Sequence, residues 1–180
     1  MITICEGRLC FEFPDEWRAI KYDDEDGFAC RKITIPDTRK VDMIVLSPSA
    51  VMLFEVKDFR HYAIENKCRF DLDGNDSLHV EIAKKVRDTL SVLIAAHRQN
   101  VDVLFDACRR THKGDKTEVI LFLEEDEECI RKFSDRRSNI QDSINIMLKP
   151  FNIRCQVQRR RTLPSSSPWR VRSRAMAETV

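Results

Sequence analysis

Three charged side chains at one end of an apolar stretch have the types and spacing for metal-dependent chemistry. Residues 40–60 contain two apolar runs around a turn at residues 47–50, which predicts a β-hairpin. Pairing the runs about this turn places Asp42 opposite Glu55, and directly opposed residues have Cβ atoms about 4.5 to 5.5 Å apart. Because side chains alternate along a strand, Lys57 returns to the face of Glu55. We therefore expect two carboxylates and one ammonium group to converge.

This arrangement favours a divalent metal site. Two carboxylates this close repel each other unless a cation lies between them. Mg²⁺ prefers one or two carboxylates, retained waters and substrate phosphate oxygens, and Mn²⁺ accepts similar ligands. Lys57 would orient or deprotonate the attacking water, or neutralise charge in the transition state. The alternative is an exposed cross-strand ion pair of Lys57 with Asp42 or Glu55, worth under about 1 kcal/mol.

The same residues resemble a known motif. An Asp at the start of one strand and a Glu-x-Lys at the end of the next, here Asp42 and Glu55-Val56-Lys57, resemble the PD-(D/E)xK, or restriction-endonuclease-like, nuclease superfamily. Val41 stands where that superfamily usually has proline. The resemblance implies a Mg²⁺-dependent phosphodiesterase in which Asp42 and Glu55 bind the metal and Lys57 assists the water.

A second resemblance involves three separate segments. Residues 20–24, 57–60 and 85–90 together resemble a group of small uncharacterised bacterial proteins. That group brings no established activity with it, so the expected chemistry rests on the motif.

The composition indicates one globular domain. With 180 residues, 42% of them hydrophobic, the chain can bury a single core, which we assign to residues 1–158. No apolar run approaches the roughly 18 residues of a membrane span, and the first residues lack the pattern of a secretory signal. We therefore expect a cytoplasmic protein without membrane association. Seven cysteines without a Cys-x-x-Cys predict neither a disulfide framework nor a zinc site.

Charge is distributed unevenly along the chain. Residues 159–180 hold six arginines and one glutamate, a net charge of +5, which leaves 25 basic and 29 acidic residues, a net charge of −4, in residues 1–158. The Arg-, Ser- and Pro-rich composition predicts a flexible tail from residue 159. This tail, or the acidic run at residues 124–128, could bind a protein partner, and the tail could also bind nucleic acid.

The segment before the motif is predicted to contain a small hairpin and a short helix. Residues 2–13 are apolar or alternating around a glycine turn, which predicts the hairpin. Pro14 opens a helical turn, and helical spacing extends to residue 21. In the resembled superfamily a glutamate on a helix before the central strands often assists the metal, and Glu16 is the candidate. The alternative is that Glu16 only complements the helix dipole.

The link into the motif contains a rival metal ligand. Residues 29–35 have the pattern of a strand, and Pro36-Asp37 follows as a literal Pro-Asp. Asp37 lies in turn-like sequence and lacks an apolar strand immediately after it. We therefore prefer Asp42.

Two helices are predicted after the motif. A core-facing stripe predicts a helix over residues 81–99, formed by Ile82, Val86, Leu90, Leu93 and Ile94. The resembled fold would place its N-terminal end near the metal site, so Lys85 and Arg87 are candidates for contacts with substrate phosphates. The alternative is a solvated pair between Glu81 and Lys85.

A shorter helix ends in a basic loop that begins with Arg109 and Arg110. These cations could contact nucleic acid, or they could complement the C-terminus of the helix. The sequence supports both interpretations equally.

The remaining elements complete the expected architecture. An apolar run at residues 117–123 predicts a buried central strand, residues 140–151 an amphipathic helix, and residues 153–157 a last strand. This order predicts an α/β fold with a restriction-endonuclease-like mixed sheet flanked by helices and preceded by the N-terminal hairpin.

These observations predict a Mg²⁺-dependent nuclease that hydrolyses phosphodiester bonds, with DNA as the favoured polymer. Two alternatives remain open at this point. One is a catalytically silent, nuclease-like subunit of a larger assembly. The other is an RNA-cutting defence effector that uses the same chemistry. A homo-oligomer is a separate possibility for either function.

Overall fold

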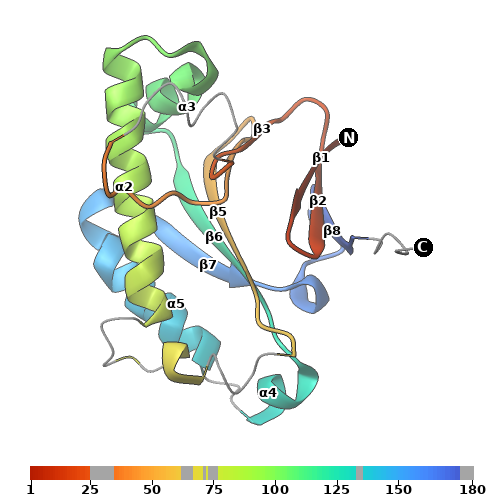
Figure 1. Cartoon of the computed structure of the whole chain (residues 1–180). Helices are drawn as coiled ribbons and strands as arrows, with labels where there is room; N and C mark the ends of the chain where they lie inside the picture. Colours follow the sequence, from red (N-terminus) through yellow and green to blue (C-terminus); the bar gives the residue numbers. More distant parts are fainter. Residues whose placement is uncertain (25–34, 62–66, 71, 73–76, 133–135, 175–180) are drawn as a thin grey trace.

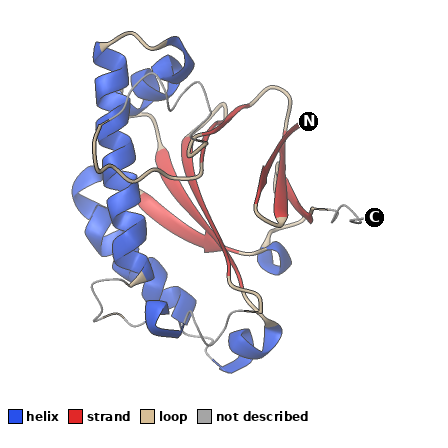
Figure 2. Cartoon of the chain, viewed as in Figure 1, coloured by secondary structure: helices blue, strands red, loops and turns tan. Residues whose placement is uncertain are grey.

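A computed structural model describes residues 1–24, 35–61, 67–70, 72, 77–132 and 136–174 of the chain. The described residues form three layers: helices, a central five-stranded sheet and a three-stranded sheet (Figures 1 and 2). The helices α2 and α5 cover one side of the central sheet, and the small sheet lies on the other side (Figure 1). The predicted mixed α/β fold with an N-terminal hairpin is confirmed at this level.

The small sheet contains both ends of the described chain. Its strands are β1 (Ile2–Glu6), β2 (Leu9–Phe13) and β8 (Arg170–Ser173), in the order β1-β2-β8 and antiparallel throughout. The turn between β1 and β2 contains Gly7 with a φ of 53°, a left-handed conformation that glycine adopts without steric cost.

Cys5 and Cys10 form a disulfide across this hairpin. The two residues oppose each other directly in the register, with Cα atoms 4.0 Å apart. The prediction that the cysteines form no disulfide is therefore wrong for this pair. Sequence spacing alone gave no signal, because the bridge depends on the exact hairpin register.

The prediction of a flexible tail from residue 159 is wrong for the part that the structure describes. Residues 170–173 pair with β2, and Trp169 is 5% exposed in the core between the two sheets. The alternation of Trp169 and Val171 with Arg170 and Arg172 supplies the strand pattern that the arginine-rich composition masked.

The central sheet has the order β3-β4-β5-β6-β7. Its strands are β3 (Arg18–Lys21), β4 (Met43–Leu46), β5 (Val51–Asp58), β6 (Thr117–Glu124) and β7 (Arg154–Gln158). β4 is antiparallel to both of its neighbours, β3 and β5, whereas β5, β6 and β7 are parallel. Ile44 pairs with Leu53, so the predicted register of the motif hairpin is confirmed.

The predicted helix over residues 14–21 is wrong. Residues 18–21 form β3, which pairs with β4 along its whole length, because ladder hydrogen bonds and burial on the sheet outweigh a weak local helix signal. Glu16 therefore lies on an exposed turn and not on a helix. The predicted strand at residues 29–35 lies almost entirely outside the described residues.

The helices are α2 (Leu78–Arg98), α3 (Asp102–His112), α4 (Glu127–Lys132) and α5 (Arg136–Leu148), with short 3₁₀ turns at Lys67–Phe70, Lys149–Phe151 and Arg160–Thr162. α2 and α3 connect the parallel strands β5 and β6. Four of the five predicted stripe residues of α2 are buried, but Ile94 is 59% exposed.

The central sheet is apolar on both faces. Leu53 and Leu121 point toward α2 and α5, and the alternate residues Phe54 and Phe122 point toward the small sheet and Trp169. Burial on both faces explains why β5 and β6 contain long apolar runs.

Side chains of α5 cover the free edge of β7. Asn145 Oδ1 accepts a hydrogen bond from Cys155 N at 2.7 Å, and Gln141 Oε1 accepts one from Val157 N at 2.9 Å. Arg137 Nη2 donates to Val157 O at 3.2 Å. The three side chains are spaced four residues apart, so one face of the helix satisfies the unpaired backbone of the edge strand.

No helix among the described residues has the length and apolar character that crossing a bilayer would require.

Candidate functional site

Asp42 and Glu55 lie together at the open end of the motif hairpin. Asp42 directly precedes β4, and continuing the β4–β5 register by one residue places it opposite Glu55. Asp42 Oδ2 accepts a hydrogen bond from the backbone N–H of Val56 at 2.6 Å. Both residues are buried, with relative exposures of 5% for Asp42 and 0% for Glu55. The predicted convergence of the two carboxylates is confirmed.

Two lysines contact these carboxylates. Lys57 Nζ lies 2.9 Å from Glu55 Oε1, and Lys85 Nζ lies 2.6 Å from the same oxygen and 3.4 Å from Asp42 Oδ1. Lys57 comes from the same strand face as Glu55, whereas Lys85 reaches across from the second turn of α2. We call Asp42, Glu55, Lys57 and Lys85 the carboxylate–lysine cluster.

Glu81 joins the cluster through Lys57. Its carboxylate lies 3.0 Å from Lys57 Nζ and also pairs with Arg69 of the first 3₁₀ turn. The alternative prediction, a solvated pair between Glu81 and Lys85, is therefore wrong. Instead, the two residues bind different partners inside the cluster, since one turn of α2 packs directly over the end of β5.

One oxygen of Glu55 is left without a partner. Glu55 Oε2 is buried and has no hydrogen-bond partner among the described residues. Burial and then the charge of Asp42 raise the pKa of Glu55, against the lowering effects of Lys57 and Lys85. A buried carboxylate oxygen with free lone pairs has the capacity to accept a further cation or proton.

Asp23 adds a third carboxyl group next to Asp42. Burial, followed by the charges of Asp42 and Glu6, raises the pKa of Asp23 to about 6. Its Oδ1 is buried and lacks a hydrogen-bond partner in the described part of the chain. The acidic sequence at residues 22–27 could not single out this residue, because its position depends on the backbone of Tyr22 and Asp23 binding Asp42 O.

Helix α2 also holds the backbone that leads into Asp42. Asp88 Oδ2 accepts a hydrogen bond from Arg39 N at 3.0 Å, and Thr89 Oγ1 accepts one from Val41 N at 3.2 Å. The segments 20–24, 57–60 and 85–90, which suggested the second resemblance, therefore each contribute contacts to Asp42 or Glu55.

The other candidate residues lie elsewhere. Arg87 pairs with Asp88 at 2.8 Å, and Arg109 pairs with Asp106 at 3.6 Å. Arg110 donates to Ser47 O at 2.6 Å and so anchors α3 to the hairpin turn, the end of the hairpin away from Asp42.

Glu16 makes no contact with Asp42 or Glu55 among the described residues. The structure thus brings Asp42, Glu55, Lys57 and Lys85 together and leaves Glu16, Arg87, Arg109 and Arg110 outside the cluster.

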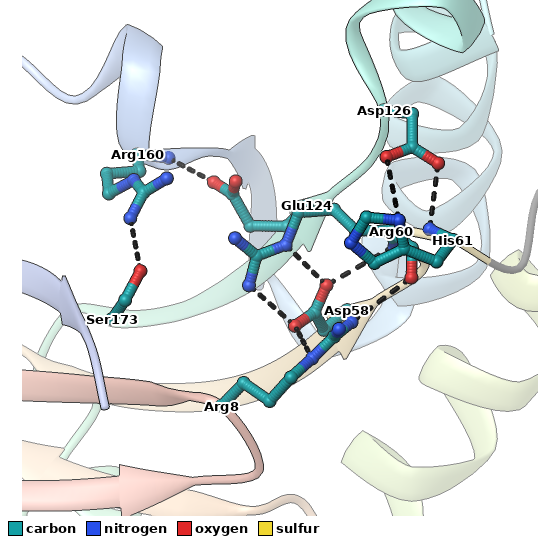
Figure 3. A network of polar contacts seen from close by, with 8 residues as sticks. All are labelled: Arg8, Asp58, Arg60, His61, Glu124, Asp126, Arg160 and Ser173. Atoms are coloured by element: carbon teal, nitrogen blue, oxygen red, sulfur yellow. Dashed lines mark hydrogen bonds and ion pairs between the residues drawn. The ribbon is translucent and has the colours of Figure 1, made fainter. Parts of the chain in front are cut away.

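A second polar network borders the cluster at the end of β5 (Figure 3). Asp58 accepts hydrogen bonds from Arg60 Nε at 2.8 Å and from Arg8 Nε at 3.0 Å. Burial acts to raise the pKa of Asp58, but the hydrogen bonds and charges of Arg60 and Arg8 outweigh it, so the pKa lies below its ordinary value. The two arginines thus share the one carboxylate of Asp58, and the charges of Glu124 and Asp126 also act on Arg60.

The acidic run and the arginine-rich segment contact each other. Glu124 accepts a hydrogen bond from Arg160 N at 2.6 Å (Figure 3), and Glu127 pairs with Arg161 at 3.4 Å. Asp126 accepts one from His61 N at 2.8 Å. The two segments that were each predicted to face a partner therefore bind one another in part.

No three His, Cys, Asp or Glu side chains within the described ranges are grouped so that they could hold a metal ion. A metal at the cluster would therefore depend on Asp42 and Glu55 together with water or substrate oxygens, a ligand set that suits Mg²⁺.

A cavity of about 1190 Å³ lies away from the cluster. It is lined by α2 from Arg87 onward, by α3, by the start of β6 and by α5 and β7. Because Thr117 and Glu118 at the start of β6 line it, the cavity is at the opposite end of the parallel strands from Lys57.

Comparison with known proteins gives one partial match. The chain is 29% identical over 119 residues to a cysteine–tRNA ligase of Neisseria meningitidis serogroup A / serotype 4A (strain DSM 15465 / Z2491), which covers 53% of this chain. The chain spans only 17% of the length of that protein. No family model matches the chain. No solved structure matches it either.

Proposed function

We propose that the protein is a metal-dependent nuclease that hydrolyses phosphodiester bonds at the carboxylate–lysine cluster, on a fold of the restriction-endonuclease-like kind. One observation carries the proposal. Glu55 Oε2 is buried without a hydrogen-bond partner among the described residues, beside Asp42 and on the strand face of Lys57. An isolated buried carboxylate oxygen costs free energy that a bound cation would recover.

Asp42 and Glu55 would hold the metal. Carboxylate oxygens are the protein ligands that Mg²⁺ prefers, and two of them leave room for water and phosphate oxygens. A bound Mg²⁺ or Mn²⁺ would polarise a phosphoryl oxygen and lower the pKa of a bound water. The hydrogen bond from Val56 N fixes Asp42 Oδ2, which leaves Oδ1 to face the cation.

Lys57 would stabilise negative charge on the phosphate that is attacked. Its ammonium group is held between Glu55 at 2.9 Å and Glu81 at 3.0 Å, so it is pre-positioned. Fixed cations of this kind stabilise the developing charge of a transition state more than that of the ground state.

The position of Lys85 favours a second candidate function, the catalytically silent subunit. Its ammonium group contacts both carboxylates and so neutralises the charge that a metal would otherwise neutralise. In an active nuclease Lys85 would turn away on metal binding, toward substrate phosphate. In a silent protein it would be the permanent counter-ion.

The partial similarity to a cysteine–tRNA ligase supports RNA as a second polymer beside DNA. A segment shared with a protein named for tRNA is consistent with contact to RNA. The chemistry at the cluster would be the same for both polymers, so only the substrate would differ.

The test is cleavage of labelled DNA and RNA oligonucleotides in Mg²⁺ or Mn²⁺. We expect cleavage by the wild type and a loss of about 10²- to 10³-fold in Lys57→Ala. Lys116→Ala is the matched control, because Lys116 is 67% exposed at the other end of the sheet, and should retain activity. Equal rates for the wild type and Lys57→Ala would refute the nuclease.

Calorimetric titration with Mg²⁺ or Mn²⁺ separates the two candidates. Binding by the wild type that is lost in Asp42→Asn supports the nuclease. Absence of binding to the wild type supports the silent subunit with Lys85 as its counter-ion.

A further inference from the structure

Two arginines near the end of β7 have buried guanidinium N–H groups without an acceptor among the described residues. Arg137 Nε, Arg159 Nε and Arg159 Nη1 are buried and have no hydrogen-bond partner in the described chain. Arg137 is fixed by its bond from Nη2 to Val157 O. Arg159 follows β7 in an extended conformation, with φ −147° and ψ 160°, so its side chain returns to the face of Val157, toward α5.

The two guanidinium groups repel each other. Burial and then the charge of Arg159 lower the pKa of Arg137, and Glu125 opposes them only in part. Two adjacent cations with unused N–H donors are favourable only when an anion lies between them. The planar fork of arginine matches the oxygens of phosphate in a bidentate geometry.

The pair is aligned with Lys57 across the sheet. Lys57 lies beside Leu123 in the parallel register, and Phe122 lies beside Gln158. Continuing the β6–β7 register by one residue places Arg159 beside Leu123. Lys57 and Arg159 are thus two strand spacings, or roughly 10 Å, apart, at the carboxyl ends of parallel strands, where α/β sheets commonly bind ligands.

We propose that Arg137 and Arg159 form a binding site for a phosphate oxyanion, and that its ligand is a backbone phosphate of the polymer next to the one attacked at Lys57. The binding site is inferred from the two arginines alone. The identification of its ligand as a polymer phosphate rests on the proposed function. A free phosphate has the same chemistry, and the experiments distinguish the two sources.

Inorganic phosphate is the first probe. In EDTA, phosphate should raise the melting temperature of the wild type above that in NaCl of equal ionic strength and shift the Arg159 Nε–Hε signal in ¹⁵N NMR spectra. Arg159→Gln should lose both effects, and Arg159→Lys, which keeps the charge without the fork, should bind phosphate roughly tenfold more weakly. Arg161→Gln is the matched control, since Arg161 is 73% exposed on the same segment, and should respond like the wild type.

An unchanged phosphate response in Arg159→Gln would overturn the site. If the glutamine variant does not fold, the phosphate affinities of Arg159→Lys and Arg137→Lys are compared with that of the wild type instead. Wild-type phosphate affinity in both variants would overturn the oxyanion site.

A fluorescent oligonucleotide is the second probe, again in EDTA so that no cleavage occurs. We expect Arg159→Gln to weaken its binding about tenfold and to reduce the slope of log affinity against log salt by about one. If Arg159→Gln loses phosphate binding but keeps its affinity for the oligonucleotide, the ligand of the site is free phosphate and not a phosphate of the polymer. Wild-type protein that binds phosphate but cleaves neither DNA nor RNA would refute the proposed function and not the oxyanion site.

Discussion

The two faces of β5 place neighbouring residues in opposite environments. Phe54 points toward the small sheet and meets the rings of Phe13 and Trp169 at centroid distances of 5.6 and 5.2 Å, both edge to face. Glu55, the next residue, points toward α2 and meets the ammonium groups of Lys57 and Lys85. Both Phe54 and Glu55 are 0% exposed, so burial is equal and only the chemistry differs.

This difference separates stability from function. Aromatic packing of the Phe54 kind contributes to the free energy of folding beyond its buried area. A buried group of charges contributes little net free energy, because desolvation offsets the attraction, and apolar replacements are often as stable. Stability alone therefore explains the Phe54 face and does not explain the Glu55 face, which supports a functional role for the cluster.

The largest expected effect is on the apolar face. Phe54→Ala should lower the free energy of unfolding by about 3 to 5 kcal/mol while the folded fraction keeps its affinity for Mn²⁺. Glu55→Gln, one residue away, should abolish Mn²⁺ binding and lower the free energy of unfolding by less than Phe54→Ala does. Urea unfolding measures the stability of both variants, and calorimetric titration measures their affinity for Mn²⁺. A loss of metal affinity in folded Phe54→Ala would contradict the separation of stability and metal binding between the two faces.

A smaller effect is expected at Lys85. Lys85→Met removes the ammonium group that contacts both carboxylates, so without metal it should destabilise the fold by about 2 kcal/mol. Because the methionine no longer competes for the carboxylates, Mn²⁺ should bind more tightly and restore the melting temperature. Weaker or unchanged Mn²⁺ binding in Lys85→Met would contradict the competition.

The pH dependence of the free energy of unfolding should reveal the titration of Asp23. Its pKa is raised from the ordinary value of 3.8 to about 6 in the folded protein, so the folded state holds this proton more tightly than the unfolded chain. The contribution to stability is fully present below about pH 4 and is lost as the pH rises through 6. Above pH 6 the ionised carboxylate of Asp23, next to Asp42, should strengthen cation binding. The gain in Mn²⁺ affinity should be at most about tenfold for each unit by which the pKa is shifted.

Comparison with Asp23→Asn isolates this contribution. The difference in unfolding free energy between the wild type and the variant should change between pH 4 and 6, and the rise in Mn²⁺ affinity over that range should become shallower. A pH-independent difference would mean that Asp23 titrates normally.

The smallest effect is expected on the outer surface of the small sheet. Arg172 Nε lies 2.6 Å from Glu12, but the arginine side chain is 55% exposed. Arg172→Ala should therefore cost less than about 1 kcal/mol in chemical denaturation. A larger loss would show that this exposed ion pair, unlike the usual case, holds β8 to β2.

The hairpin register was predictable because a short turn and alternating apolar residues fix strand pairing. The position of the short helix was not, since Pro14 at a helix-like start cannot reveal that residues 18–21 find a partner in β4. Local propensity is a weak signal, and pairing with a distant strand overrides it.

The cluster could be predicted only in part. Asp42, Glu55 and Lys57 follow from one hairpin, whereas Lys85 enters from α2 and takes both carboxylates as partners. Asp23 depends on backbone contacts between distant segments, and a cluster of four neighbouring acids gives no means of choosing among them.

The pairing of β2 with β8 has a consequence for synthesis on the ribosome. Residues 9–12 find their partners only at residues 170–173, so the small sheet cannot be completed until almost the whole described chain has been translated. Until then Trp169 is absent from the face of Phe54 and Phe122, and of the small sheet only the β1–β2 hairpin is available to cover it. The part of this apolar face that Trp169 covers therefore stays open to intermolecular contact. At about 5 to 20 residues per second, the nascent chain would carry this incompletely covered surface for several seconds.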